Sequence, residues 1–151
     1  DEVTASCGNV ANRSLTVNNT TANVTVANWA GPATCGSAQA VINVTVPSST
    51  PSNAVVYLSG NFSTLGTGMS SANDWVANEI PMTKTGTNTW TLNVSAVSGT
   101  TLQYKFDLGT WDNTEETSSC GALANRTFYF NGSGSSYTAN NTVTAWKGYG
   151  C

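Results

Sequence analysis

The stretch TWTLNVSAVSGTTLQYKFDLG, residues 89–109, alternates apolar and polar side chains on both sides of a short turn. Side chains in a strand point alternately to opposite faces, so each half has one apolar face. The inward side chains are Trp90, Leu92 and Val94, then Leu102, Tyr104, Phe106 and Leu108. The outward ones of the second half are Gln103, Lys105 and Asp107. The stretch therefore predicts two half-buried strands joined by a turn at residues 97–100.

Short segments of the same kind lie on both sides of this pair, bounded by Gly, Pro, Asn and Ser. The further expected strands are residues 40–46, 54–60, 125–130 and 141–146, with a turn at 82–88. Apolar residues do not recur at helical spacing over any long segment. Short strands at such intervals are typical of a sandwich or barrel. We therefore expect an all-β chain that forms an antiparallel β-sandwich over about residues 36–151.

A phrase from the end of this region also occurs near residue 1. SCGNVANRSLTV (residues 6–17) matches SCGALANRTFYF (residues 119–130). The aligned positions are Cys7 with Cys120, Asn12-Arg13 with Asn125-Arg126, Trp29 with Trp146, and Cys35 with Cys151. Residues 1–35 thus correspond to the last two strands of a module. We expect them to form an additional N-terminal β-hairpin or arm, a half-repeat before the complete sandwich of residues 36–151.

The four cysteines favour an oxidising compartment and a disulfide framework. If the two terminal strands of each copy are antiparallel neighbours, the pairs Cys7–Cys35 and Cys120–Cys151 meet at the open end of each hairpin. Each loop of roughly 30 residues would then contribute about 3–4 kcal/mol. The pairing Cys35–Cys120 stays open as an alternative. The chain has no His and no C-x-x-C spacing, so we expect neither a metal site nor a cofactor.

Composition narrows the partners and the location. Charged residues make up 9% and the net charge is -3, which excludes a basic surface for nucleic acid. No apolar run reaches the roughly 20 residues of a membrane span. Because the sequence does not open on a signal-peptide pattern, we expect it to be a mature or trimmed chain. Ten Asn-x-Ser/Thr sequons favour an extracellular glycoprotein, secreted or at the cell surface, and Asn/Thr-rich composition is the alternative explanation. They are Asn12, Asn18, Asn19, Asn23, Asn43, Asn61, Asn93, Asn125, Asn131 and Asn140.

Several phrases resemble one known family. VVYLSGNFSTLG, GTTLQYKFDLGTWDNTEE, ANRTF and NTVTAW are similar to segments of the starch-binding domains of amylases and glucoamylases, the family 20 carbohydrate-binding modules. The resemblance covers residues 36–148 and implies an immunoglobulin-like sandwich with a non-catalytic α-glucan site. It assigns that site to Trp75, Lys105 and Trp111, although the family's short Gly-x-Trp has become GTGMSSANDW before Trp75.

Other conspicuous side chains have structural explanations. Trp90 lies on an inward face, and Trp29 and Trp146 end equivalent strands, so we expect packing roles. Arg126 is expected to bind carboxylates of the DNTEE segment, residues 112–116. The adjacent pair Glu115 and Glu116 cannot flank a glycosidic bond as acid and base. Without His, nucleophile elbow or metal ligands, the sequence predicts no enzyme.

Two functions remain. The favoured one is a structural subunit of an extracellular filament or surface layer, because a hairpin without its module leaves unpaired edges. Its arm would either fold back on its own chain as extra strands or add strands to a neighbouring copy, and the second arrangement would repeat head to tail into a filament. The arm residues are Leu15, Val17, Val24, Val26 and Trp29. The alternative is an α-glucan-binding module, for which Trp111 is a sugar platform rather than a subunit contact.

Overall fold

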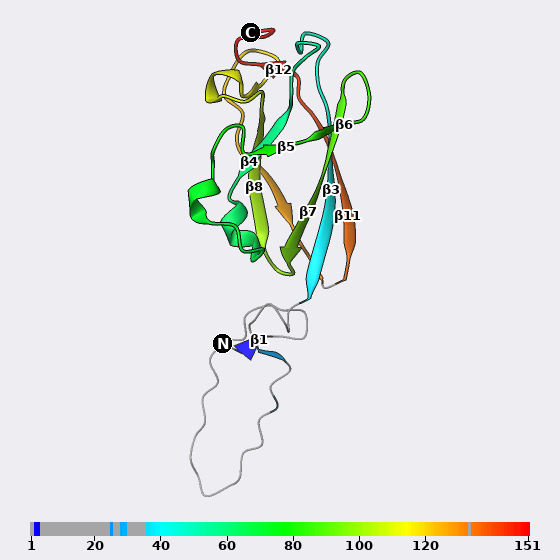
Figure 1. The fold of residues 1–151 in the computed structure, drawn as a ribbon, viewed down its shortest axis with the longest axis vertical. Coiled ribbons are helices and arrows are strands. Elements are labelled where there is room, and N and C mark those ends of the chain that lie inside the picture. The colour runs from blue at the N-terminus through cyan, green and yellow to red at the C-terminus, as the bar shows by residue number, and fades with distance from the viewer. Residues whose placement is uncertain (1, 4–24, 26–27, 30–35, 133) are drawn as a thin grey trace, which may run out of the picture.

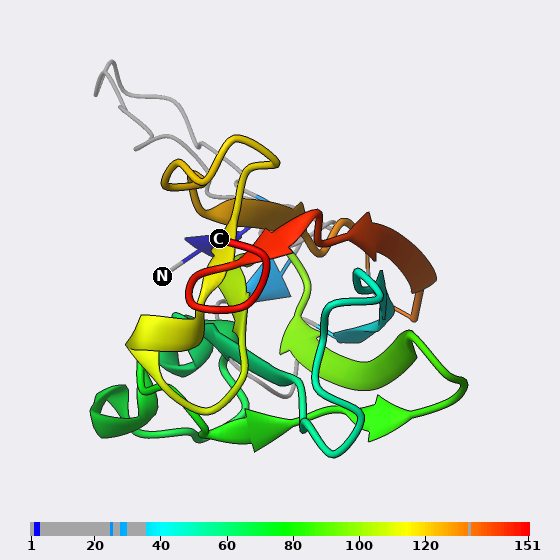
Figure 2. The ribbon, with the colours of Figure 1, turned by 90° about the horizontal axis from the view of Figure 1, so that it is seen from above.

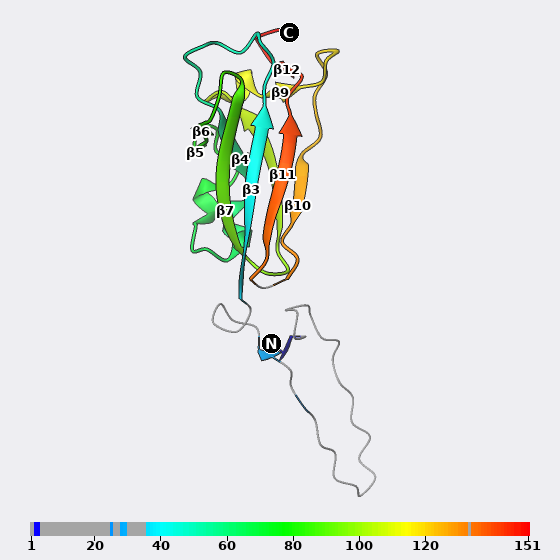
Figure 3. The same cartoon turned by 90° about the vertical axis from the view of Figure 1, so that its right-hand side faces the viewer.

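Two four-stranded sheets face each other across an apolar interior (Figures 1 and 3). The computed structural model describes residues 2–3, 25, 28–29, 36–132 and 134–151. One sheet has the order β10 (Arg126–Tyr129), β8 (Thr101–Asp107), β4 (Tyr57–Gly60) and β5 (Ile80–Pro81). The other has the order β11 (Ser136–Thr142), β3 (Ser37–Thr45), β7 (Thr89–Val97) and β6 (Thr83–Lys84). The predicted all-β sandwich is confirmed.

The strands predicted from residues 89–109 form as expected but enter different sheets. β7 pairs with β3 along nine residues, from Ser37 opposite Val97 to Thr45 opposite Thr89. β8 lies in the facing sheet, between β4 and β10. The turn at residues 97–100 therefore carries the chain from one layer to the other, so that the apolar faces of the two strands meet.

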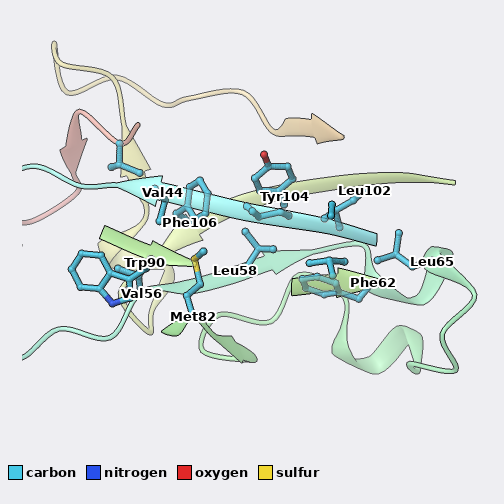
Figure 4. Packing of buried hydrophobic residues seen from close by; sticks show 14 of the residues in the cluster. Val44, Val56, Leu58, Phe62, Leu65, Met82, Trp90, Leu102, Tyr104 and Phe106 are labelled. Carbon is cyan, nitrogen blue, oxygen red and sulfur yellow. The ribbon is translucent and has the colours of Figure 1, made fainter. Parts of the chain in front are cut away.

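The interior is built from alternate positions of the long strands. Figure 4 shows side chains from both sheets in contact, with Leu58, Leu102 and Phe106 fully buried. Trp90 is 2% exposed and belongs to this core, as predicted. The 3₁₀ turn η1 (Phe62–Leu65) adds Phe62 and Leu65 from the side. Each such side chain contributes about 1.5–3 kcal/mol by leaving water.

Trp146 has the structural role expected of it. It ends β12 (Ala145–Trp146), which pairs with β9 (Glu115–Glu116). Its side chain is fully buried, and the indole Nε1–H donates to Thr50 Oγ1 over 2.8 Å. The hydrogen bond satisfies the one polar group of a buried indole. This tryptophan is therefore unavailable as a surface platform.

The expected terminal hairpin is wrong. β10 and β11 lie in opposite sheets, and β11 pairs with β3 in parallel, from Ser136 opposite Gln39 onward. A parallel pair needs a long crossover, which the whole body of the sandwich supplies here. The disulfide Cys120–Cys151 nevertheless forms, with a Cα–Cα distance of 5.4 Å. The β9–β12 pair brings these two residues together, rather than a terminal hairpin.

Little of residues 1–35 falls within the described residues. β1 (Glu2–Val3) pairs antiparallel with β2 (Asn28–Trp29), with Glu2 opposite Trp29. The other predicted arm residues and the cysteine pair of this half-repeat lie outside the described residues; they are Cys7, Leu15, Val17, Val24, Val26 and Cys35. Their disulfide and the division at residue 35 stay predictions. Within the described part of the chain, no helix has the length and apolarity to cross a membrane.

Candidate functional site

Trp75 lies in a loop that crosses the outer side of β4. The loop, residues 74–79, follows the 3₁₀ turn η2 (Ser71–Asn73). The Trp75 amide donates to Gly60 O over 2.9 Å, and the Ser59 hydroxyl lies 2.9 Å from Val76 O. Trp75 and Asn78 both have left-handed backbones, with φ of 56° and 68°. Non-glycine residues rarely adopt this conformation without support from their surroundings, so these hydrogen bonds fix the loop.

Trp111 lies in a second loop, residues 108–113, which begins where β8 ends. It starts the 3₁₀ turn η3 (Trp111–Asn113) and is 41% exposed, unusual for so large an apolar side chain. The Leu108 amide donates to Asn113 O over 3.1 Å and closes the loop. Gly109 has a φ of 98°, which favours glycine at this bend.

The two tryptophan-bearing loops meet at Asp107. Its Oδ1 accepts hydrogen bonds from the amides of Gly109 (2.8 Å) and Asn78 (3.4 Å). A Cβ on Gly109 would lie 4.0 Å from the Cβ of Asn78, so the loops are in contact there. Figures 1 and 2 place η2 and η3 on the same side of the molecule. The loops that carry Trp75, which is half-buried, and Trp111 are thus joined through one carboxyl group on one side of the molecule.

Lys105 lies on β8, two residues before Asp107. It is opposite Ser59 on β4, while Gly60, which anchors Trp75, is opposite Tyr104. Its Nζ donates to the backbone carbonyl of Leu123, so the ammonium is partly committed within the protein. An ammonium has three donors, and the remaining ones can bind hydroxyl groups. Lys105 thus lies on the strand that leads into the loop of Trp111, next to the strand that binds the loop of Trp75.

A polar groove opens next to the loop of Trp111. Its volume is about 420 Å³, and it combines aromatic rings with amide groups. The lining residues are Pro51, Asn53, Ala54, Val55, Tyr57, Asn78, Leu108, Gly109, Asn113 and Tyr149. Tyr149 is 41% exposed and Val55 is 43% exposed, so the rim presents apolar surface. The groove is lined mainly by polar surface, to which Tyr57 and Tyr149 add aromatic rings.

Burial changes the ionisation of two groups beside these residues. Burial raises the pKa of Asp107, and its hydrogen bonds with Ser59, Gly109 and Asn78 only partly oppose this. Burial also raises the pKa of Tyr104, whose hydroxyl donates to Asn141 Oδ1 over 3.0 Å. Tyr104 faces the interior. Of these two groups, only Asp107 is hydrogen-bonded to the two loops, so only its ionisation can affect them.

Arg126 serves the fold, as predicted from the DNTEE segment. Its Nη2 lies 2.7 Å from Glu115 Oε2, and its Nε lies 3.1 Å from Oε1. The Glu115 side chain is fully buried and also accepts from the Phe106 amide over 3.0 Å. This bidentate pair joins β9 and β10 to the end of β8. Both groups are engaged inside the molecule and do not belong to the surface of the two loops.

The predicted sequons differ in how free their amides are. Asn43 Nδ2 donates to Asn140 Oδ1, and Asn61 Nδ2 donates to Thr101 O. Asn93, Asn125 and Asn131 are exposed. The four N-terminal sequons lie outside the described residues; they are Asn12, Asn18, Asn19 and Asn23. Glycosylation at any of these positions stays a prediction.

One group of potential metal ligands, Glu116 with Cys120 and Cys151, lies close together within the described residues. The sulfur atoms of these two cysteines are joined in a disulfide. Metals bind cysteine as the thiolate. While the disulfide is intact, the carboxylate alone offers a ligand in this group.

Sequence reasoning missed the role of Asp107. Alternation places it on the outer side of β8, yet it is fully buried because the loop of residues 74–79 covers it. A local signal was available in Asp107-Leu108-Gly109. An Asp that accepts from the amide two residues later forms an Asx turn, and Gly at that amide is typical. The partner loop, and with it Asn78, has no comparable sequence signal.

Comparison with known proteins gives amylolytic relatives. The chain is 32% identical over 106 residues to an amylopullulanase of Thermoanaerobacter thermohydrosulfuricus, a match covering 70% of this chain. It is also 32% identical over 106 residues, 69% of the chain, to an alpha-amylase of Niallia circulans. The chain spans only 7% of the length of each of these relatives. No protein-family model matches it.

The fold has a counterpart among solved structures. A family 15 glucoamylase from Hypocrea jecorina superimposes with a TM-score of 0.50 at 15% identity, covering 81% of this chain and 19% of that one. At this identity the likeness concerns the fold alone. It agrees with the sandwich described above.

These relatives overturn the favoured functional hypothesis. The filament or surface-layer subunit was inferred from the N-terminal half-repeat, whose arm residues lie outside the described part of the chain. The similar proteins are amylolytic enzymes, and the match is a small segment of each. They favour the alternative, α-glucan binding. The N-terminal half-repeat was weak support for a filament subunit. A second copy of the end of a module does not show what the module binds.

Proposed function

We propose that this chain is a non-catalytic α-glucan-binding module of a secreted protein. The observation that carries the proposal is the match of 106 residues to a small segment of an amylopullulanase and an alpha-amylase. A segment that is 7% of such a protein has the size of an accessory module rather than of the whole enzyme. The exposed Trp111 and its neighbouring loop supply a surface with suitable chemistry.

The binding surface is assigned to the two loops and the strand between them. An indole ring offers a flat apolar face with a polar edge, which suits the apolar face of a glucose ring. Trp75 and Trp111 would provide two such faces, and Lys105 would bind hydroxyl groups with its free donors. Two faces on loops held at a fixed angle suit a curved α-glucan better than a flat β-glucan.

Retention of single-residue variants on immobilised amylose tests this assignment. Trp111→Ala should weaken binding at least about tenfold, because it removes stacking worth about 1.4 kcal/mol or more. Tyr129→Ala is the matched control: Tyr129 is 56% exposed but lies opposite Thr101, at the other end of β8. Equal retention of both variants would reject Trp111 as a platform. A loss of equal size in both variants would show that the effect is not specific to the surface around Trp111.

A further inference from the structure

Asp107 holds a buried position that connects both tryptophan-bearing loops to the sheet. Asp107 is fully buried, although its side chain is on the outer face of β8. Its Oδ1 accepts from Asn78 N and Gly109 N, one amide from each loop. Its Oδ2 lies 2.6 Å from Ser59 Oγ on β4. Three separate elements thus converge on one carboxyl group that the resemblance does not assign to the site.

The Ser59 hydroxyl shows which protonation state completes this arrangement. Its Oγ lies 2.6 Å from Asp107 Oδ2 and 2.9 Å from Val76 O, and a hydroxyl has one hydrogen. If Asp107 is ionised, that hydrogen can serve only one of the two acceptors. If Asp107 carries a proton, Oδ2–H donates to Ser59 Oγ, and Ser59 donates to Val76 O. All contacts of the cluster are satisfied only with the neutral acid.

The carbonyl that would lose its partner belongs to the residue after Trp75. Trp75 and Asn78, on either side of that segment, both have left-handed backbones. Such conformations cost about 1–3 kcal/mol each and persist only when neighbouring contacts hold them. Loss of the bond to Val76 O therefore weakens the support of the loop that carries Trp75. The loop of Trp111 keeps its own amide bond to Asp107 Oδ1 in either state.

We propose that Asp107 is a positioning residue of the glucan site: as a neutral acid it joins the loops of Trp75 and Trp111 through Ser59, and its ionisation costs the bond from Ser59 to Val76 O and so loosens the loop of Trp75. This inference rests on the proposed function. It names a residue that touches no sugar but sets the relative position of the two indole platforms. Glucan binding should therefore weaken as Asp107 loses its proton.

The surroundings of Asp107 favour the neutral form. Burial raises its pKa, as described above. Other ionisable groups on the adjoining elements have partners of their own. Lys105 Nζ donates to Leu123 O, Asp112 pairs with Lys147 at 3.0 Å, Asp74 binds Ser63, Glu79 accepts from Asn73, and Glu115 pairs with Arg126. Tyr57 is opposite Asp107 on β4. Among the described residues, the hydrogen-bond partners of Asp107 are Ser59, Asn78 and Gly109, none of which is a cation, so no ion pair opposes the effect of burial.

The test measures maltoheptaose binding of the whole chain between about pH 3 and pH 8, a window that extends well above the ordinary Asp pKa of about 3.9. Wild-type affinity should fall about 2- to 10-fold as the pH rises through the pKa of Asp107, the equivalent of one lost hydrogen bond. Asp107→Asn keeps a donor toward Ser59 and an acceptor toward both amides, so its affinity should not change with pH. An unchanged wild-type profile in Asp107→Asn would overturn the proposal.

Ser59→Ala removes one of the two links between Asp107 and the loop of Trp75 while leaving Asp107 in place. It removes the link between Oδ2 and Val76 O, but keeps the amides of Asn78 and Gly109 on Oδ1. Its affinity should be about 2- to 10-fold lower at acidic pH than that of the wild type, without a further fall on raising the pH. An affinity and pH profile equal to those of the wild type would contradict the role given to Ser59.

Nuclear magnetic resonance of the wild-type protein distinguishes this inference from the proposed function. The carboxyl carbon of Asp107 reports its protonation, and hydrogen exchange at the Trp75 and Asn78 amides reports the loop. Both should change together whether or not any glucan binds: the protection factors of these amides, which correct for the base-catalysed rise of exchange with pH, should fall as Asp107 loses its proton. Absence of glucan binding with these changes intact would reject the proposed function alone. Protection of the Trp75 and Asn78 amides that stays constant while Asp107 titrates would reject the positioning role.

Discussion

At the scale of single residues, buried charge is the costliest feature of this molecule. Glu115 is fully buried, and its carboxyl oxygens accept hydrogen bonds from Nε and Nη2 of Arg126. Asp107 is equally buried without a cation among its contacts, and its raised pKa is the consequence. The two buried carboxyl groups therefore avoid an unpaired buried charge in different ways. One is neutralised by a partner, and the other is favoured as the neutral acid.

Removing the partner of Glu115 should therefore be severe. Arg126→Met leaves a buried, uncompensated carboxylate and should lower the free energy of unfolding by about 3–5 kcal/mol, as measured by urea denaturation. In the double variant Glu115→Gln/Arg126→Met the unpaired charge is gone, and much of the loss should be recovered. A loss below about 1 kcal/mol in the single variant would show that Glu115 is not held as an ionised group.

The raised pKa of Asp107 also predicts how stability depends on pH. The folded protein holds this proton more tightly than the unfolded chain does, so the contribution is fully present below the unfolded pKa and is lost as pH rises through the folded pKa. Denaturation at a series of pH values should show this decline in the wild type. Asp107→Asn should lack it. Identical pH dependence in the two proteins would mean that Asp107 ionises as in the unfolded chain.

At the scale of elements, the pairs that position the loops are closely packed. A Cβ on Gly60 would lie 2.4 Å from the carbonyl oxygen of Gln103, so β4 approaches β8 too closely for any side chain there. Gly60 is also the residue that anchors Trp75 through its carbonyl. This contact couples the strand pairing directly to the position of one proposed platform.

Alanine at Gly60 should thus disturb both stability and binding. Gly60→Ala is expected to cost about 1–3 kcal/mol through overpacking, measured by thermal or urea unfolding. Gly68→Ala is the control, because Gly68 has a φ of 84° but no atom within 4 Å of an added Cβ. It should lose only about 1 kcal/mol, from backbone strain. The assignment of close strand packing fails if the control is the more damaging of the two.

The positions of individual strands could be predicted from the sequence more easily than which strands pair with each other. Alternation in residues 89–109 identifies β7 and β8 and their buried faces, because a strand's period of two depends only on local geometry. It could not identify the parallel pairing of β11 with β3, which joins residues about a hundred positions apart. The same limit applies to the site. Trp111 was found as an exposed loop residue, whereas the Asp107 contacts come from three elements brought together by folding.

At the scale of the whole molecule, the C-terminal end is joined to the sandwich by one covalent bond. The disulfide Cys120–Cys151 spans 31 positions of sequence. Its closed loop contains β10, β11 and β12, which belong to different sheets. The bond therefore limits how far the last strands can separate in the unfolded chain.

Replacing both cysteines with serine should cost about 3–4 kcal/mol, the value expected for a loop of this length. The measurement is urea unfolding of Cys120→Ser/Cys151→Ser beside the wild type. Because Tyr149 of the groove lies within the last residues, glucan affinity of the variant is worth recording too. An unchanged free energy of unfolding would show that the Cys120–Cys151 disulfide does not stabilise the fold by restricting the unfolded chain.

The central claim is that this sandwich binds α-glucan. Calorimetric titration of the whole chain with maltoheptaose, and in parallel with cellohexaose, tests it most directly. We expect saturable binding of maltoheptaose and none of cellohexaose under the same conditions, because the two proposed indole platforms suit a curved chain. Equal binding of both sugars, or binding of neither at any pH, would contradict it.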